Sequence, residues 1–425
     1  MSFPRYPKYK DSGVEWLGQV PAHWEVCALK RIVRIQSGES ITAEGIQESG
    51  EYPVFGGNGL RGYTSTFTHD GHFVLVGRQG ALCGNINYGC GKFWASEHAV
   101  VASPVKQVET VWLGEMMRAM NLNQYSVSAA QPGLSVDLVS RLATVLPPLP
   151  EQTTIAAFLD RETAKIDALK AEQQRLIELL KGKRQAVISH SVTKGLNPHA
   201  PMKPSGIEWL GDVPAHWRVG AIKYFVLPKN GAIKTGPFGS HLTSSDMQSG
   251  TVKVYNQRSV IDGDFDSGDN FISEEKFAEL ATFETFPGDL LITTRGTIGR
   301  AAILPQNAER GILHPCLLRL QPDNAHIETE FLKTLIQDSD LMKTQLSYLS
   351  NATTIEVIYS YTIASVIIPV PPVAEQHAIM EYLAHQTAKF DTLTAEAQRA
   401  IDLLQERRTA LISAVVTGQI DVRST

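Results

Sequence analysis

Two pairs of long internal repeats, arranged in the same order, constrain the fold of this chain more than any other feature. Residues 12–26 read SGVEWLGQVPAHWEV and residues 205–219 read SGIEWLGDVPAHWRV, with 12 of 15 positions identical. A second pair of segments begins with LPPLPEQ at 146–152 and with VPPVAEQ at 370–376. Repeats in one order indicate a duplicated chain. Each half therefore has a tryptophan motif, a divergent globular stretch and a further repeated segment.

The second repeated segments are predicted to be long helices. Prolines precede each of them, at 147, 148 and 150 and at 371 and 372, and more than forty residues then follow without a proline. At 1.5 Å per residue each helix would span roughly 65 Å. Gly195 and Gly418 stand where C-terminal caps are expected.

Apolar residues at seven-residue intervals predict that these helices form a coiled coil. The predicted seam positions are Leu159, Ile166, Leu180 and Val187 with Ile155, Leu169 and Leu176 in the first helix, and Leu383, Phe390, Leu404 and Leu411 with Ile379, Leu393 and Ala400 in the second. Since neither stripe can be buried alone, the simplest arrangement pairs the two helices antiparallel. The alternative is that each helix packs on its own globular stretch.

The expected fold is therefore α+β, with two globular domains joined by two long antiparallel helices and related by a pseudo-two-fold repeat. The expected divisions are a tryptophan-motif segment at 1–26, a first domain at 27–145, a first helix at 146–196, a linker with the repeated motif at 197–219, a second domain at 220–369, and a second helix with a C-terminal tail at 370–425.

Both globular stretches combine β-rich runs with a helix. Buried strands are predicted at 73–76 and 289–292, and helices at 111–120 and 330–337. Each strand leads into a polar turn bounded by glycines, which is Gly77-Arg78-Gln79-Gly80 closed by Gly84-Asn85 in the first stretch. In the second stretch the turn is Thr293-Thr294-Arg295-Gly296, closed by Gly299-Arg300.

These turns, and other glycine-rich segments, carry the side chains that read base edges in DNA. Arginine can pair with guanine and glutamine or asparagine with adenine, while glycine lets the backbone approach a phosphate. The alternative for each is an ordinary surface turn capped by its own polar residues. The candidate DNA-binding residues are Asn58, Arg61, Tyr63, Arg78, Gln79 and Asn85 in the first stretch, and Lys234, Ser240, His241, Asn256, Gln257, Arg258, Thr294, Arg295 and Arg300 in the second.

The tryptophan motifs are not expected to read DNA. Trp16, Trp24, Trp209 and Trp217 could stack on bases. However, a motif repeated almost verbatim cannot distinguish two different half-sites. We expect it to pack against the helices or to dock a common partner.

Composition limits the setting in which such a chain could act. No apolar run is long enough to span a membrane, and Met1–Tyr6 lacks the apolar stretch of a signal peptide, so a cytoplasmic protein is expected. The four cysteines form no CxxC and are expected to be buried thiols without a metal. The net charge of −5 is unusual for a DNA-binding protein, so basic residues should gather on one face.

The chain resembles the specificity subunits of Type I restriction–modification systems. The resemblance is carried by the tryptophan motif, by the PPLPEQ and PPVAEQ helix entries, and by the helix ends KRQAVI at 183–188 and RRTALI at 407–412. It covers nearly the whole chain through the duplicated layout, whereas the globular stretches match mainly through their strand and glycine-turn pattern.

The resemblance implies a non-catalytic subunit that binds double-stranded DNA. Each globular stretch would be a target recognition domain that reads one half of a bipartite, asymmetric site, and the helices would set the gap and dock two modification subunits. Those partners would carry S-adenosylmethionine and methylate adenine, and restriction subunits would add ATP- and Mg-dependent translocation and cleavage. No cofactor or metal is expected on this chain.

Catalytic motifs should then be missing. The sequence contains no GxxxxGK[ST], (N/D)PP(Y/F), HExxH or GxSxG motif. Asp266 with Glu274, Glu275 and Lys276 loosely resembles a metal-dependent nuclease centre, but we interpret these residues as a solvated loop. A nuclease or methyltransferase acting alone is thus disfavoured, and a bivalent protein-interaction scaffold remains the alternative to a DNA-reading subunit.

Overall fold

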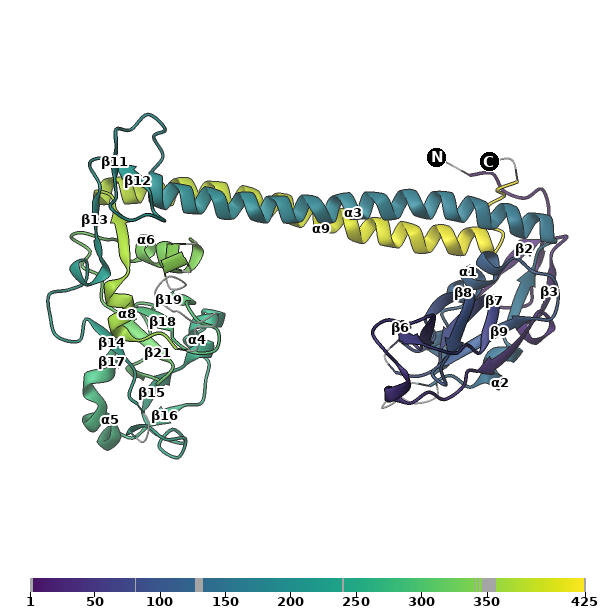
Figure 1. The fold of residues 1–425 in the computed structure, drawn as a ribbon, viewed down its shortest axis with the longest axis horizontal. Coiled ribbons are helices and arrows are strands. Elements are labelled where there is room, and N and C mark those ends of the chain that lie inside the picture. The colour runs from purple at the N-terminus through teal and green to yellow at the C-terminus, as the bar shows by residue number, and fades with distance from the viewer. Residues whose placement is uncertain are drawn as a thin grey trace. The chain divides into compact units, whose positions relative to one another are not determined.

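The computed structural model describes residues 3–423 except 81, 127–132, 239–240, 340, 343 and 346–356. The chain forms two compact units, one from residues 1–175 and 397–425 and the other from 176–396 (Figure 1). Each unit therefore contains one globular domain with part of each long helix. This confirms the duplicated α+β organisation that the repeats predict.

The first unit is built around a six-stranded sheet in the order β4-β9-β7-β8-β5-β6. Its strands are β1 (Tyr9–Asp11), β2 (Gln19–Pro21), β3 (Glu25–Ala28), β4 (Val33–Ser37), β5 (Tyr52–Gly56), β6 (Gly59–Thr64), β7 (His69–Gly77), β8 (Ile86–Ala95), β9 (Ala99–Pro104) and β10 (Ala143–Leu146). Its helices are α1 (Thr110–Ala119), α2 (Val136–Arg141), the first part of α3 (Leu149–Lys194) and the last part of α9 (Val373–Val416). The strand predicted at 73–76 and the helix predicted at 111–120 are confirmed.

Apolar side chains of β7 are buried on both faces of this sheet. Val74 and Val76 enter the main core with Trp112 of α1, whereas Leu75 packs on the other face with Phe93. Successive side chains of a strand point to opposite faces, so a run of apolar residues indicates a strand covered on both sides.

The second unit splits the corresponding sheet into two. Its four-stranded sheets have the orders β14-β21-β18-β19 and β16-β15-β20-β17. Its strands are β11 (Met202–Pro204), β12 (Asp212–Pro214), β13 (Arg218–Ala221), β14 (Ile233–Thr235), β15 (Val252–Tyr255), β16 (Phe271–Ile272), β17 (Glu284–Thr285), β18 (Leu290–Thr293), β19 (Ala301–Ile303), β20 (Gly311–Leu313), β21 (Leu317–Leu320) and β22 (Ile367–Val370). Its shorter helices are α4 (Gln257–Asp262), α5 (Glu274–Leu280), α6 (Thr329–Lys333), which continues as the π-helix η7 (Thr334–Asp338), and α8 (Ser360–Ser365).

The long helices pair antiparallel within each unit. In the first unit Asp167 of α3 lies 3.3 Å from Arg408 of α9, and Lys170 donates to Gln405, so the partner number falls as the helix proceeds. In the second unit Arg184 lies 3.5 Å from Asp391. Gly195 and Gly418, each with φ of +78°, follow the ends of the two helices, which confirms the predicted caps.

The seven-residue seam predicted for these helices is confirmed where its residues are buried and wrong at three leucines; the buried seam residues are Ile155, Leu159, Ile166, Ile379, Leu383 and Phe390. Leu169, Leu176 and Leu393 are exposed, by 46%, 41% and 38% respectively. In α3 four buried isoleucines recur every eleven residues, at Ile155, Ile166, Ile177 and Ile188, whereas in α9 the buried residues Leu383, Phe390 and Ala397 recur every seven. Eleven residues complete three turns at 3.67 residues per turn, close to the 3.6 of a straight helix, so the pattern in α3 needs no left-handed supercoil.

Each tryptophan motif packs against both long helices. Trp24 is fully buried in a core that contains Ile155 of α3 and Val415 of α9. Trp217 is buried in the same way in a core with Val192 of α3 and Ile379 of α9. Trp16 and Trp209 are partly buried against these cores. The expectation that the motifs pack against the helices is confirmed.

A glutamate–glutamine pair at the start of each long helix is hydrogen-bonded both to the tryptophan motif and to the globular domain of the same unit. The indole of Trp24 donates to Glu151 (2.9 Å), and the amide oxygen of Gln152 accepts from the backbone of Glu109 at the start of α1. Their counterparts Glu375 and Gln376 bind Trp217 (3.1 Å) and the backbone of Glu328 (2.8 Å). Within the described ranges no helix is apolar enough over its length to cross a membrane.

Candidate nucleic-acid interface

In the first domain, the polar turn between β7 and β8 is closed by its own backbone. The amide of Gly77 donates to the carbonyl of Asn85, and the amide of Gly84 donates back to Gly77, both at 2.8 Å. The turn is anchored on each side, because Arg78 donates to His98 (2.9 Å) and accepts from Leu134 (2.9 Å). The strand and glycine-bounded turn predicted from the sequence are thus present, and backbone hydrogen bonds join the turn to neighbouring segments.

The tip of the β5–β6 hairpin lies against this turn. A Cβ added at Gly57 would approach the carbonyl oxygens of His98 and Gln79 to 3.2 and 3.5 Å. A Cβ added at Gly56 would come within 2.4 Å of Cδ of Arg61. These two glycines therefore let the hairpin lie close to the turn and let the Arg61 side chain cross the strand.

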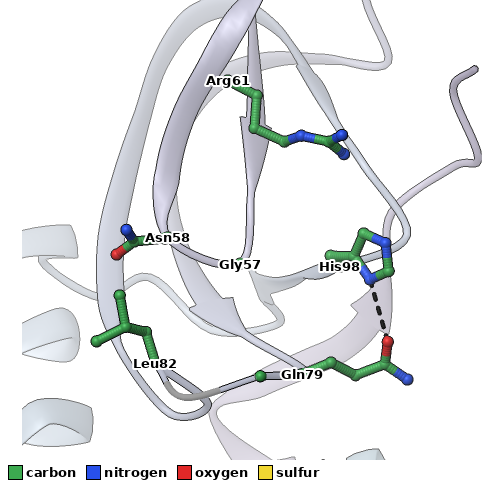
Figure 2. Close-up of a pocket in the computed structure, with 7 residues that line it drawn as sticks. Gly57, Asn58, Arg61, Gln79, Leu82 and His98 are labelled. Atoms are coloured by element: carbon green, nitrogen blue, oxygen red, sulfur yellow. Dashed lines mark hydrogen bonds between the residues drawn. The ribbon is translucent and has the colours of Figure 1, made fainter. Parts of the chain in front are cut away.

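Together the turn and the hairpin enclose an open hollow of about 500 Å³. Figure 2 shows Asn58, Arg61, Gln79, Leu82 and His98 around it, with His98 Nδ1 3.1 Å from Oε1 of Gln79. No carboxylate lines the hollow, although Glu97 lies behind His98 with its Oε1 3.2 Å from Nε2. The hollow thus offers amide and guanidinium groups suited to base edges and phosphates.

The second domain contains an equivalent turn between β18 and β19. Thr293 donates to Arg300 (2.9 Å) and accepts from Gly299 (3.0 Å), as Gly77 does with Asn85 and Gly84. Thr294 donates to Cys316 (2.9 Å) and accepts from Ile358 (2.9 Å), as Arg78 does with His98 and Leu134. The two turns therefore have the same pattern of backbone hydrogen bonds. By this pattern Gln79 corresponds to Arg295, and Asn85 corresponds to Arg300.

A hollow beside α4 in the second domain has a different chemistry from the first hollow. Asn256 caps α4, accepting from the amides of Arg258 (2.9 Å) and Ser259 (3.3 Å). The Arg258 side chain is 89% exposed and its Nε lies 3.1 Å from Asp262. A hollow of about 240 Å³ is lined by Asn256, Arg258, Ser259, Asp262, Asp264, Ser267, Gly268 and Asp269. Three aspartates therefore line this hollow, whereas the described lining of the first hollow contains no carboxylate.

Burial shifts the pKa values of two side chains next to the second turn. Nδ1 of His314 lies 2.8 Å from Sγ of Cys316 and accepts from the Cys316 amide (3.3 Å). Burial lowers the pKa of His314 and raises the pKa of the Cys316 thiol. Both groups are consequently held neutral, and the ring presents no positive charge to a ligand near neutral pH.

The structure brings most of the predicted residues to these two turns. Asn58, Arg61 and Gln79 line the first hollow, and Asn85 donates to Asn58 (3.4 Å). In the second domain Asn256 and Arg258 line the hollow, Arg295 and Arg300 are exposed on the turn, and Gln257 lies about 3.5 Å from where a Cβ at Gly296 would stand.

Other predicted residues lie elsewhere or have their side chains occupied. The Thr294 side chain is buried, with its hydroxyl donating to the Cys316 carbonyl (2.9 Å), and Arg78 is half-buried. Tyr63 pairs through its backbone with Gln47, away from the hollow. Lys234 lies 4.7 Å above the ring of Phe283. His241 is exposed but lines neither hollow, and Ser240 lies outside the described residues.

Sequence reasoning missed several residues at these sites. In the first domain they are Leu82 and His98, and in the second they are Cys316 and the aspartates at 262, 264 and 269. The available signal was the position of His98 and Cys316, because each directly precedes a buried strand, β9 or β21, that follows the glycine turn. Cys316 is half-buried and Cys90 is exposed, so the expectation of four buried thiols is wrong for these two.

The carboxylates of the nuclease-like pattern are engaged separately. Glu274 accepts from Thr251 (2.8 Å) and lies 3.2 Å from Arg310, and Lys276 pairs with Glu279 at 3.0 Å. Ser273 caps the helix that carries them. Among the described residues, no group of three or more His, Cys, Asp or Glu is placed to hold a metal ion.

Comparison with known protein families shows which family this chain belongs to. The model of the Type I restriction modification DNA specificity domain matches residues 21–179 and 239–402. The chain belongs to this family. The two matches fall on the two halves of the duplicated chain, so each half is one specificity domain with its long helix.

Curated relatives of this specificity family match over different lengths. The Type I restriction enzyme EcoprrI specificity subunit of Escherichia coli is 46% identical over 137 residues, which is 31% of this chain and about a third (34%) of that relative. A putative type I restriction enzyme specificity subunit of Haemophilus influenzae is 24% identical over 85% of this chain and 86% of its own length.

Solved structures share the fold of the specificity chain. A chain from a structure on complex assembly and conformational transition of the type I R-M system has a TM-score of 0.67 at 16% identity, covering 94% of this chain and 99% of that one. The HsdS subunit from Thermoanaerobacter tengcongensis has a TM-score of 0.50 at 17% identity, covering 94% and 98%. These likenesses concern the fold alone.

Proposed function

We propose that this chain is the DNA-reading specificity subunit of a Type I restriction–modification complex and contributes no catalytic group of its own. Each globular domain would read one half of a bipartite, asymmetric site in double-stranded DNA. The observation that carries the proposal is the pair of turns with matched backbone bonds and different side chains, Gln79 and Asn85 in one and Arg295 and Arg300 in the other. Equivalent loops with different donors select different bases.

The long helices would set the unread gap and dock two modification subunits. Residues of α3 and α9 belong to both units, so helix length limits how far apart the two reading turns can lie. The leucines exposed on the helices, Leu169, Leu176 and Leu179 of α3 and Leu403 of α9, would supply apolar surface for such docking.

Catalysis and cofactors would reside on partner subunits. The modification subunits would bind S-adenosylmethionine and methylate adenine, and the restriction subunits would use ATP and Mg. This assignment is supported by the absence of nucleotide- and methyl-transfer motifs from the sequence. We expect the complex to act in the cytoplasm, where the chromosome that it reads is found.

A methylome tests the proposal. The chain would be expressed with its modification subunit in a methylation-deficient host, and modified adenines mapped across the genome. A bipartite motif with two different halves, lost when this chain is omitted, is expected. No new methylation, with both proteins soluble and co-purifying, would overturn the proposal and favour a bivalent protein-interaction scaffold.

A further inference from the structure

Three neighbouring hollows that share lining residues, here called the groove, lie between the first reading turn and the C-terminal part of α9, all within the first unit. The hollow beside the turn shares Leu82 with a neighbouring hollow of about 240 Å³, which extends along Asn85 to Arg118 and Asn121. A third hollow of about 480 Å³ shares Arg118 and Asn121 with the second. It is completed by Ala119 and, on α9, by Gln405, Arg408, Thr409, Ile412 and Ser413.

Three arginines line the groove, and its described lining residues include no carboxylate. Arg61, Arg118 and Arg408 line it, whereas neither aspartate nor glutamate is among the lining residues of the three hollows. The whole chain has 44 acidic and 39 basic residues. Glu115 and Asp167, which pair with Arg118 and Arg408, lie outside this lining, so the groove itself presents guanidinium donors that suit phosphate oxygens.

Arg118 is held in a fixed orientation at the middle of the groove. Its Nε donates to the buried carboxylate of Glu115 (3.0 Å) and its Nη2 donates to the carbonyl of Ile86 (3.2 Å). The side chain remains 34% exposed, and donors on Nη1 are unused by these two bonds. A guanidinium fixed beforehand loses little freedom when it binds a phosphate oxygen.

The α9 wall supplies a second fixed cation. Nε of Arg408 lies 3.3 Å from Asp167, and Lys170 beside it donates to Gln405 at 2.5 Å. On the α1 side the carbonyls at the helix end are occupied, because Asn121 donates to Arg118 (3.1 Å) and Gln124 donates to Met120 (2.9 Å). The backbone carbonyls of Arg118 and Met120 are therefore already hydrogen-bonded at this end of the groove.

Among the described residues of the second unit, two side chains differ at the equivalent place. Gln337 stands at the position of Arg118, but its Oε1 accepts from the backbone amide of Ala301 of β19, whereas Arg118 donates to the carbonyl of Ile86 of β8. Asp338 takes the place of Ala119, and its carbonyl accepts from Gln185 of α3 at 2.6 Å. Arg184, the counterpart of Arg408, pairs with Asp391 at 3.5 Å as Arg408 pairs with Asp167 at 3.3 Å, so this arginine is common to both units. The loss of one arginine and the gain of one aspartate make this place unsuited to an anion.

We infer that the groove holds the sugar–phosphate backbone of one DNA strand as it leaves the first reading turn toward α9, and that only the first unit provides this path. The inference rests on the proposed DNA-reading function and adds a one-sided phosphate track to it. Backbone contacts position a protein on DNA without selecting its sequence. The groove should therefore contribute affinity and salt dependence, while the turn contributes sequence preference.

The test measures DNA binding by the complex of this chain with its modification subunit between 50 and 200 mM salt. The probe is a duplex carrying the motif found by the methylome. Arg118→Gln and Arg408→Gln should each make the slope of log affinity against log salt shallower by about 0.9. The loss of affinity between 50 and 200 mM salt should then be about 3.5-fold smaller than in the wild type. Thr409→Glu, which adds a negative charge on the exposed face of α9, should weaken binding to all sequences.

Matched variants separate the phosphate track from structural effects and from docking of a partner. Arg118→Lys and Asp167→Asn keep the cations and should keep the slope. Arg184→Gln is the twin of Arg408→Gln in the second unit and should also leave it unchanged. Equal salt slopes for the wild type, Arg118→Gln and Arg408→Gln would overturn the inference. Loss of the modification subunit from both Arg184→Gln and Arg408→Gln would also overturn it, because these arginines would then dock a partner protein. A wild-type complex that binds no DNA would instead defeat the proposed function itself.

Discussion

The indole Nε1 of Trp24 donates to Oε2 of Glu151 at 2.9 Å, and the same bond joins Trp217 to Glu375 at 3.1 Å in the other half of the chain. Each glutamate also lies within 2.7 Å of a histidine of the motif, His23 or His216. The neighbouring glutamines, Gln152 and Gln376, bind the first helix of their own domain. One dipeptide therefore joins three parts of each unit.

Removing the Glu151 carboxylate should destabilise the first unit selectively. Glu151→Ala leaves the indole N–H of the fully buried Trp24 without its acceptor, which costs about 1–3 kcal/mol. Hydrogen exchange followed by mass spectrometry should show faster exchange in the peptides around Trp24. Glu375→Ala should do the same around Trp217. Equal loss of protection in both units from either change would contradict this local role.

Exchanging the turn residues should change one half of the recognised motif at a time. Gln79→Ala should relax one half-site and Arg295→Ala the other, because each side chain stands at the equivalent position of a separate turn. A lost bidentate base contact lowers discrimination by about 1–3 kcal/mol, or roughly 5- to 150-fold. Methylome mapping of each variant gives the answer directly. An unchanged motif in both variants would exclude these two residues from base reading.

The eleven-residue seam of α3 predicts which of its positions determine stability. Ile166→Ala should reduce the free energy of unfolding by about 2–5 kcal/mol, because Ile166 is buried between the paired helices. Leu169→Gln, three residues away and 46% exposed, should change it by less than about 0.5 kcal/mol. Urea unfolding of both variants distinguishes this seam from a seven-residue one, in which both changes would be costly.

The stability of the second unit should fall as the pH drops below about 6.5. Burial lowers the pKa of His314 in the folded chain, so the unfolded chain takes up the proton first and unfolding becomes more favourable in acid. Protonation at Nδ1 would also break the bonds with Cys316. Unfolding measured from pH 7.5 to 5.5 should be less pH-dependent in His314→Gln than in the wild type. A steeper dependence in the variant would refute this assignment.

The sequence predicted the elements whose signals are local. The strand at 73–76, the helix at 111–120, the helix caps at Gly195 and Gly418, and the glycine-bounded turns all follow from residue type over short segments. The seam was predicted incorrectly at Leu169 and Leu176, because these leucines fit a seven-residue pattern as well as the buried Ile177 fits an eleven-residue one. Only the facing helix decides which of the two stripes is buried.

The candidate site was predicted in part for the same reason. Gln79, Asn58 and Arg61 were found because glycine-rich polar turns are visible in the sequence, and the structure places them around one hollow. His98 was missed because it reaches the hollow only when β8 and β9 bring it beside Gln79. Thr294 looked equivalent to its neighbours in sequence, yet its hydroxyl is used inside the domain.

The sequence by itself determined that this protein is a duplicated chain with two divergent domains, two long helices and paired tryptophan motifs, because repeats and periodic patterns are properties of residue order. The tertiary structure decided what those parts do together. It joined Trp24 to Glu151 across 127 residues and placed Arg118 beside Arg408 in one groove while giving the second unit Gln337 and Asp338 instead. Such contacts depend on which surfaces meet when the chain closes long loops, and no local pattern encodes that choice.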